Sequence, residues 1–157
     1  MEFIELGPEQ EEHFVDFPCA RPRQDWTESS EYAIQFSLAW NLRAKRVRAL
    51  GALSGDRLMG VLIWAPEVED SRNWQCIVLG VRRGDQGRGI GRQLKEKLIE
   101  LGRVEGIREI NSLVHRENTD MLKLNRALDA VVIPDPDDSE GTNLICTIEV
   151  IPDSLST

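Results

Sequence analysis

Three glycines at alternate positions, in the segment Gln86-Gly87-Arg88-Gly89-Ile90-Gly91, constrain this chain more than any other feature. The segment lies between an apolar run, residues 77–81, and a stretch with helical periodicity. Glycine reaches φ values that other residues avoid and lets a ligand approach the backbone closely. A helix that follows such a turn directs unpaired N–H groups and the positive end of its dipole toward the turn. The order strand, glycine turn, helix therefore predicts a site for a phosphate or pyrophosphate.

The charges around this segment agree with an anionic ligand. The whole chain carries a net charge of −8, yet residues 82–97 carry six positive and two negative side chains, a local balance of +4: Arg82, Arg83, Arg88, Arg92, Lys95 and Lys97 against Asp85 and Glu96. Two common phosphate loops do not fit. No Gly-Lys pair occurs in the chain, which excludes a Walker-type loop, and Arg92 stands where a dinucleotide fingerprint needs its third glycine.

The spacing Gln86-x-x-Gly89-x-Gly91 resembles the Q/R-x-x-G-x-G/A motif that marks acetyl-CoA binding in the GNAT N-acetyltransferase superfamily. A second block, residues 114–118 followed by 121–128, resembles that family's passage from its fifth strand into the next helix, where an Asn precedes an apolar stretch. The resemblance extends from about Arg48 to about Val150. It implies a single α/β (α+β) domain over residues 1–157, with a mixed, mostly antiparallel sheet flanked by helices, a splayed central strand pair and a coenzyme-binding core at about 73–128.

Hydrophobic periodicity and turn residues predict the same elements. Strands are expected at 3–6, 47–53, 58–64, 74–81, 107–114, 131–133 and 144–150, and helices from Pro8, over 27–45, from about Gly91 to a C′ glycine at Gly106, and over 118–128. The strand at 74–81 is apolar at Ile77, Val78 and Leu79 and is expected to be buried on both faces. In the last helix, Met121, Leu124 and Leu128 are expected to face inward.

The resemblance also assigns roles. The pantetheine arm of the coenzyme would pair with main-chain groups near Leu79 and Val81, and the N–H of Leu79 would polarise the thioester carbonyl. Asn118 would contact the coenzyme arm or act only as a helix cap. The pyrophosphate would be bound by backbone N–H groups, with Arg88 or Arg92 adding charge. The cofactor-binding set in the glycine segment is thus Gln86, Gly87, Arg88, Gly89, Ile90, Gly91 and Arg92.

The proton acceptor is less constrained. An alkylammonium has a pKa near 10.4, so a base or a water chain must take its proton. Candidates are His115, at a strand end, and the carboxylates Glu67, Glu69 and Asp70. Each has a plain alternative as a solvated surface residue.

The leaving thiolate marks a departure from the family. Many members carry a Tyr acid seven residues after the Asn, a position that Asn125 occupies here, and Asn donates a hydrogen bond but no proton. Asn125 is therefore either a substitute donor or a helix residue bonded to a neighbouring carbonyl. Asp129-Ala130 stands where the family usually has Gly-Phe, which affects the acceptor side rather than coenzyme binding.

Composition bounds the remaining alternatives. An acidic chain of 157 residues argues against nucleic acid as main partner, and no apolar run approaches the roughly 18 residues of a membrane span. Three dispersed cysteines, Cys19, Cys76 and Cys146, show no zinc spacing; no metal is expected, and a reducing cytoplasm is the expected setting. Homodimers are frequent in the family, but nothing in this chain decides the oligomeric state.

Three functions follow from the resemblance. The first is transfer of an acetyl group from acetyl-CoA to a primary amine, on a small molecule or a protein or peptide, by direct attack in a ternary complex. The second is a catalytically reduced acyl-CoA-binding or regulatory module, which the missing Tyr favours. The third is transfer of a longer acyl group or transfer to a hydroxyl.

Overall fold

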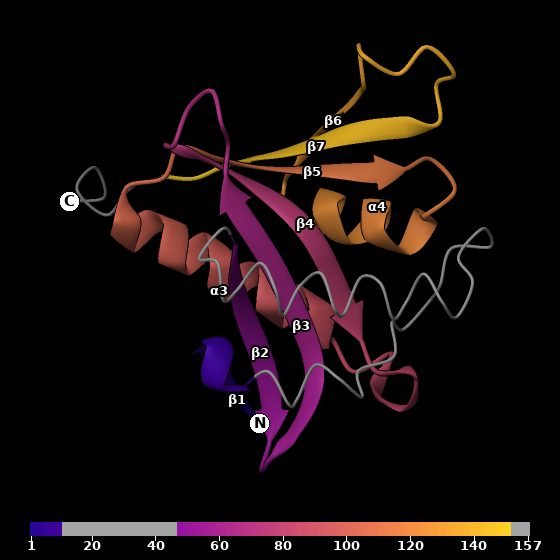
Figure 1. Ribbon diagram of the computed structural model, residues 1–157. Helices are drawn as coiled ribbons and strands as arrows, with labels where there is room; N and C mark the ends of the chain where they lie inside the picture. Colours follow the sequence, from indigo (N-terminus) through magenta and orange to yellow (C-terminus); the bar gives the residue numbers. More distant parts are fainter. Residues whose placement is uncertain (11–46, 152–157) are drawn as a thin grey trace. The chain divides into compact units, whose positions relative to one another are not determined.

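The structure, a computed structural model, describes residues 1–10 and 47–151 (Figure 1). These residues form an α+β fold with a seven-stranded sheet in the order β1-β2-β3-β4-β5-β7-β6. The strands are β1 (Glu2–Leu6), β2 (Arg48–Ser54), β3 (Arg57–Pro66), β4 (Asn73–Val81), β5 (Glu109–His115), β6 (Val131–Pro134) and β7 (Asn143–Glu149). Between them lie the short 3-10 helices η1 (Pro8–Gln10) and η2 (Arg83–Asp85) and the helices α3 (Ile90–Glu105) and α4 (Thr119–Ala127).

The sheet is mixed, as predicted. β1 with β2, β2 with β3, β5 with β7 and β6 with β7 pair antiparallel, whereas β4 and β5 pair parallel. The parallel ladder runs from Asn73 opposite Glu109 to Cys76 opposite Ser112. Both strands continue past its end, β4 to Val81 and β5 to His115, as a splayed pair requires.

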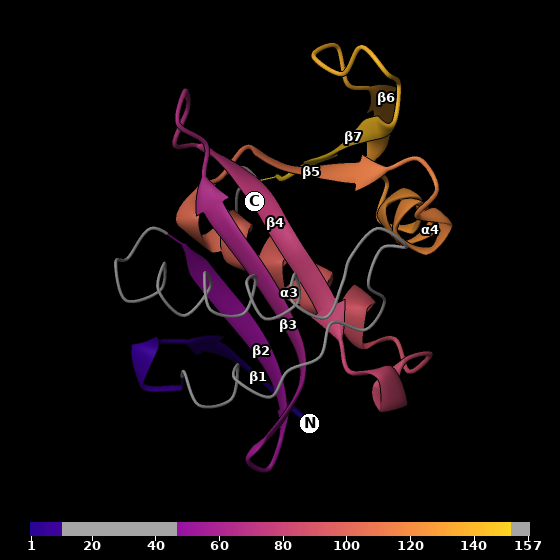
Figure 2. The same ribbon diagram turned by 45° about the vertical axis from the view of Figure 1, so that its right-hand side comes forward.

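The chain divides into two compact units. Unit 1 contains Met1–Ala65 and Val78–Lys97, and its core is the cluster Leu6, Ala49, Leu53, Leu58, Val61 and Ile63. The long β2–β3 hairpin of this unit turns at Gly55, which has a φ of 62° (Figure 2). Gly60 lets α3 approach β3, because a Cβ at that position would lie 2.8 Å from Cγ2 of Ile90. The end of β4, from Val78, and the start of α3, up to Lys97, thus belong to one compact unit.

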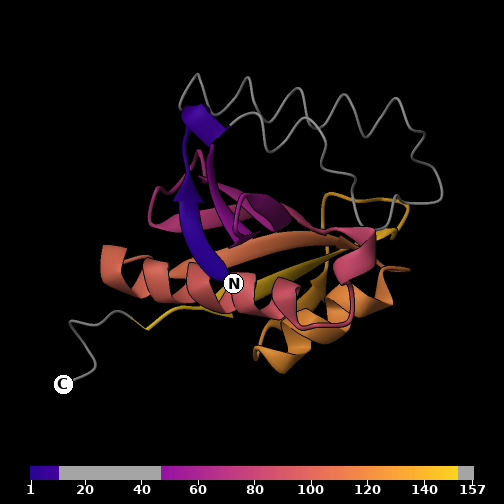
Figure 3. The ribbon, with the colours of Figure 1, turned by 90° about the horizontal axis from the view of Figure 1, so that it is seen from below.

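Unit 2 contains Pro66–Ile77 and Leu98–Thr157. Within it α4 covers one face of the β5–β7 ladder (Figure 3), and its core joins Leu122 to Val114, Leu144 and Cys146. Cys76 and Cys146 are both buried free thiols, as their apolar surroundings in the sequence predicted.

Two helices end in the same Schellman hydrogen-bond pattern. At the end of α3, Ile107 N–H donates to Gly102 O and Gly106, at φ 76°, is the predicted C′ glycine. At the end of α4, Ala130 N–H donates to Asn125 O and Asp129 N–H to Arg126 O, and here the C′ residue is Asp129 at φ 63°. The positive φ at this position explains why the family usually has Gly here. In this chain Asp129 adopts the same backbone conformation.

One expectation was wrong, and a second was only partly right. Ile77 is 51% exposed and Val78 and Leu79 are half-buried, because the β4–β5 ladder ends one residue before Ile77 and the strand is not enclosed on both faces. In α4 the fully buried residues are Leu122 and Asn125, whereas Met121, Leu124 and Leu128 are half-buried, and Met121 packs against the core as expected. The helix has only nine residues and buries two of them, one turn apart. Such a short apolar stripe does not define from sequence which face of the helix points to the core.

The predicted helix over 27–45, Cys19 and Tyr32 lie outside the described residues, as does the continuation of the helix predicted from Pro8. No α-helix of the described part is long and apolar enough to cross a bilayer.

Candidate functional site

The glycine segment is shaped as the sequence predicted, with one difference. β4 ends at Val81, Arg82 N–H donates to Met59 O at 2.8 Å, and the chain then turns through η2 into the glycines. Gly87 and Gly89 have φ values of 81° and 76°, a region that other residues rarely adopt. Gly91 does not use this freedom, because it already lies in the first turn of α3. Two of the three glycines are thus required by backbone conformation.

The start of α3 presents amide groups toward that turn. Its first helical hydrogen bond runs from Gln93 N–H to Gly89 O at 3.0 Å. The N–H groups of Ile90, Gly91 and Arg92 consequently have no acceptor within the helix. A Cβ added at Gly87 or Gly89 would meet no heavy atom within 4 Å, so space is open beside the backbone here. Open N–H groups at a helix N-terminus suit an anion.

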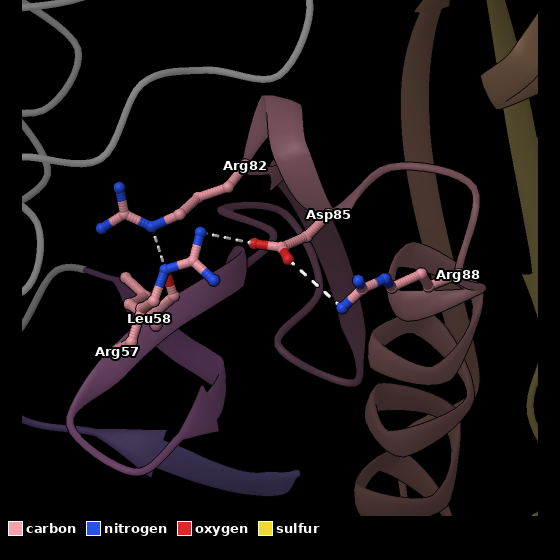
Figure 4. A network of polar contacts seen from close by, with 5 residues as sticks. All are labelled: Arg57, Leu58, Arg82, Asp85 and Arg88. Atoms are coloured by element: carbon pink, nitrogen blue, oxygen red, sulfur yellow. Dashed lines mark hydrogen bonds and ion pairs between the residues drawn. The ribbon is translucent and has the colours of Figure 1, made fainter.

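A buried carboxylate fastens this turn to the β2–β3 hairpin (Figure 4). The side chain of Asp85 is 4% exposed; its Oδ2 lies 3.1 Å from Arg57 Nη2 and its Oδ1 lies 3.5 Å from Arg88 Nη1. The contact to Arg57 is an ion pair without hydrogen-bond geometry. Arg82 Nε donates to the Leu58 carbonyl in the same hairpin. Two contacts, Asp85 with Arg57 and Arg82 with Leu58, therefore join the turn to the hairpin.

Three arginines around the turn have acidic partners but keep exposed guanidinium groups. Asp85 is shared by two arginines, and the other acid, Glu96, accepts from Arg92 Nε at 2.9 Å. The side chains of Arg57, Arg88 and Arg92 stay 57%, 65% and 54% exposed. Solvent-facing guanidinium groups around open amides favour the approach of an anion.

Unit 1 brings together the cofactor candidates Leu79, Val81 and Gln86 to Arg92. Leu79 and Val81 are half-buried residues of β4. The acid–base candidates Glu67, His115 and Asn125, together with Asn118, belong to unit 2.

Glu67 is fixed by two hydrogen bonds that the sequence did not reveal, and a third holds its partner Asn111. Its N–H donates to Asn73 O at 2.9 Å, and its Oε1 accepts from Asn111 Nδ2 at 2.7 Å. Asn111 Oδ1 in turn accepts from Thr147 Oγ1 at 2.7 Å. Because an ionised carboxylate has further acceptor positions, Glu67 can still take a proton or bind a cation.

The neighbouring carboxylates are differently placed. Asp70 receives Arg72 Nε on Oδ1 at 3.1 Å and Nη2 on Oδ2 at 3.2 Å, and also the Arg72 backbone N–H. These hydrogen bonds from Arg72 lower the pKa of Asp70 below its ordinary value, which makes it a weaker base. Glu69 is exposed. Asp70 thus fits the role of a turn residue better than that of a proton acceptor.

His115 is the half-buried last residue of β5, and its Nδ1 accepts from Glu117 N–H at 3.1 Å. In the neutral ring the proton is then on Nε2. The lone pair that a base needs is therefore already used by the backbone.

The two asparagines of the second block hold the helix itself. Asn118 is the N-cap of α4, and its Oδ1 accepts from Met121 N–H at 3.2 Å. Asn125 is fully buried, and its Nδ2 donates to Met121 O at 2.9 Å. Its Oδ1 has no hydrogen-bond partner among the described residues.

Comparison with known proteins decides the family. The family model described as "Acetyltransferase (GNAT) family" matches residues 10–128. The chain belongs to the GNAT acetyltransferase family.

Solved structures agree in fold at low identity. A PaiA N-acetyltransferase from Thermoplasma acidophilum in complex with coenzyme A is 16% identical with a TM-score of 0.70, and the match covers 95% of this chain and 99% of that one. An aminoglycoside 6'-acetyltransferase type Ii is 17% identical (TM-score 0.73; 97% and 99% covered), and a ribosomal-protein-alanine N-acetyltransferase from Brucella melitensis is 14% identical (TM-score 0.68; 95% and 99% covered). No curated protein sequence matches the chain.

Sequence reasoning for this GNAT chain missed the side chains that position others. Asp85 was counted only as a charge, and Arg57 was not considered, since their pairing depends on the hairpin reaching the turn. Asn111 carried only a weak signal: it is an amide in a predicted strand that also contains Arg108, Glu109 and Ser112. Thr147 gave no comparable signal.

Proposed function

We propose that this GNAT protein transfers an acetyl group from acetyl-CoA to a primary amine by direct attack in a ternary complex. One observation carries the proposal: Gly87 and Gly89 adopt positive φ and open the backbone beside the first amides of α3. That is the geometry a diphosphate requires. We treat residues 1–157 as one domain, with the coenzyme-binding core at about 73–128.

In this proposal the N–H groups of Ile90, Gly91 and Arg92 bind the coenzyme diphosphate. Arg88 adds charge, because its side chain is 65% exposed and its contact to Asp85 is long, at 3.5 Å. The pantetheine arm runs along the backbone near Leu79 and Val81, as the family resemblance implies, and Asn118 is a further contact by the same resemblance. The Thermoplasma acidophilum protein, which shares the fold, is in complex with coenzyme A, and this supports coenzyme A as the ligand.

Glu67 is the proposed proton acceptor. The ammonium loses one proton to Glu67, and the neutral amine nitrogen then attacks the thioester carbonyl. The C–N bond forms, and the oxyanion is stabilised by the Leu79 N–H, the role that the family resemblance gives it. The C–S bond then breaks, and the second proton of the nitrogen passes through water to the departing thiolate sulfur. The Nδ1 of His115 is engaged by a backbone amide, and the pKa of Asp70 is lowered. The positioned carboxylate of Glu67 is the better acceptor.

The thiolate leaves without a strong acid. A thiol pKa near 8.5 makes thiolate a tolerable leaving group, whereas general acid catalysis typically contributes 10²–10⁴-fold. Asn125 has no ionisable proton, and its amide is bonded to Met121 O. Slow but measurable transfer is the expected result.

Turnover is tested by following thiol release from acetyl-CoA with a panel of amines, with binding of CoA measured in parallel by calorimetry. Release that depends on the amine supports transfer, and Glu67→Gln should lower kcat at least tenfold with CoA affinity unchanged. A longer acyl-CoA series and a hydroxyl acceptor complete the panel. CoA binding without release to any acceptor would instead support the second candidate, a catalytically reduced acyl-CoA-binding module. The enclosed, bonded state of Asn125 favours that candidate.

A further inference from the structure

The carboxylate of Glu67 lies on a particular face of the unit 2 sheet. Along β5 the residues Ile110, Ser112 and Val114 are buried, and Val114 belongs to the core that α4 covers. Successive side chains on a strand point to opposite faces, so Asn111 lies on the other face. The hydrogen bond from Asn111 to Glu67 therefore brings the carboxylate to the face that α4 does not cover.

That face carries apolar side chains beside the carboxylate. Leu113 follows Asn111 by two residues and shares its face; it pairs with Ile145 of β7, which pairs with Ile133 of β6. Leu113, Ile145 and Ile133, here called the apolar row, lie side by side across three strands. Leu113 is 51% and Ile133 47% exposed, and Ile145 is half-buried. Ile77, 51% exposed on β4, lies on the same face.

Exposed apolar side chains that adjoin one another indicate a ligand or partner surface more often than isolated ones do. Glu67 lies at one end of the row, and Glu109 and Glu149 lie farther along the same face in the same direction. Negative charge at one end of an apolar row is complementary to a cation that carries an apolar body. A polyhydroxylated amine would place hydroxyls against the row, where they lose water without gaining hydrogen bonds. The negative charge and the apolar row together thus favour amines with an apolar carbon skeleton.

We propose that this face binds the acceptor, and that the acceptor is a primary amine with an apolar carbon skeleton. Its nitrogen is received by Glu67, and its skeleton lies on the apolar row. Thr147 and Asn111 are positioning residues: their hydrogen bonds hold Oε1 of Glu67 in one place, so the second carboxylate oxygen faces the amine. The proposal rests on the proposed acetyl transfer and names its substrate class.

Amines of graded polarity test the substrate class. We expect kcat/KM to rise about threefold with each methylene from propylamine to hexylamine. Hexylamine should exceed ethanolamine and putrescine by at least tenfold. Leu113→Thr should raise the KM for hexylamine at least fivefold and leave that for ethanolamine unchanged. The matched control is Val68→Thr, since Val68 is fully exposed outside the row, and it should have no effect.

The outcomes separate this inference from the proposed function. Equal effects of the two Thr variants, or a preference for polar amines, overturn the inference while acetyl transfer stands. If thiol release is seen with no amine, the proposed function fails, and calorimetry with hexylamine alone then tests the inference. Hexylamine binding that Leu113→Thr abolishes supports the inference. An absence of hexylamine binding overturns it. Concentration-dependent dimerisation that Leu113→Thr abolishes also overturns it, because a second copy then covers the face.

The positioning role has its own readout. Thr147→Val removes the hydroxyl at nearly constant volume and should lower kcat about tenfold with KM for the amine within twofold. Thr147→Ser keeps the hydroxyl and should restore kcat. Urea unfolding of both variants establishes that each is folded. If the Val variant keeps full kcat, or if Ser fails to restore it, Thr147 has no positioning role.

Discussion

Nη2 of Arg57, at the start of β3, lies 3.1 Å from Oδ2 of Asp85 in the turn before the glycine segment. The carboxylate is 4% exposed and the arginine 57%. Arg57, in the β2–β3 hairpin, thereby compensates the buried charge of Asp85 in the turn proposed to bind the coenzyme. Arg88 is the second compensating residue.

Removing Arg57 should destabilise the protein through Asp85. We expect Arg57→Ala to lower the free energy of unfolding by about 1 kcal/mol, since the arginine is largely solvated but its loss leaves a buried carboxylate with one distant partner. In the Asp85→Ala background the same change should cost much less. Urea unfolding of the four proteins measures the coupling. Arg92→Ala, which breaks the surface pair with Glu96, is the control and should cost under about 0.5 kcal/mol.

Gly89→Asp should weaken coenzyme binding at least tenfold while the protein stays folded. The new side chain meets no atom within 4 Å, so its effects are backbone strain of about 1 kcal/mol and a negative charge beside the proposed diphosphate site. Gly55→Asp is a matched control, because Gly55 also has a positive φ and open surroundings but lies in the β2–β3 turn. Calorimetry with CoA compares them. Equal affinities in the two variants would remove the glycine segment from the site.

Asp129→Gly should stabilise the protein by about 1 kcal/mol. Asp129 holds a φ of 63° at the C′ position of α4, where glycine has no steric cost and where a negative charge opposes the helix dipole. Gly106→Ala makes the opposite change at the end of α3 and should destabilise by a similar amount. Thermal unfolding of both variants checks the sign. A lower Tm for Asp129→Gly would mean that the aspartate side chain contributes more than its backbone conformation costs.

Asp138 should make stability depend on acid pH. Its carboxylate accepts from Asn143 N–H at 2.7 Å and Thr142 Oγ1 at 2.9 Å, and these bonds lower its pKa from the ordinary value of 3.8. The folded state therefore binds the proton less readily, and the stabilisation is complete above 3.8 and is lost as pH falls through the lower folded pKa. The Tm difference between the native protein and Asp138→Asn should be constant near neutral pH and shrink below pH 3.8. A difference that stays constant at pH 3 would contradict this.

Asn125→Ala should leave both stability and turnover nearly unchanged. The substitution loses the bond to Met121 O but also removes a buried Oδ1 without a partner among the described residues, so unfolding free energy should change by no more than about 1 kcal/mol. If Asn125 assists the departing thiolate, kcat will instead fall tenfold or more in a folded variant. Stopped-flow thiol release distinguishes these results.

The fold was predictable where local pattern and tertiary packing agree. The turns at Gly87 and Gly89, the helix that follows them and the C′ glycine Gly106 all follow from spacing and backbone sterics, and the structure has them as expected. Ile77 was mispredicted because burial depends on whether a neighbouring strand continues, which a run of apolar residues does not reveal.

Within the site, the main-chain groups were predictable and the supporting side chains were not. A glycine spacing marks where the backbone bends, so Gly87 to Arg92 could be named from the sequence alone. The bonds of Asn111 to Glu67 and to Thr147 join segments that only the strand order brings together. For the same reason the sequence left Glu67 and His115 both open as proton acceptors, whereas their hydrogen-bond partners now distinguish them.

The burial of Cys76 and Cys146 has a practical consequence for every assay above. Disulfide-exchange reagents that report free coenzyme react only with accessible thiols, and both of these sulfurs are shielded while the chain stays folded. With Cys19 replaced by serine, a colour change in the first seconds would come from released coenzyme. A slow later rise would signal that the protein itself is opening, so one cuvette records catalysis and integrity together.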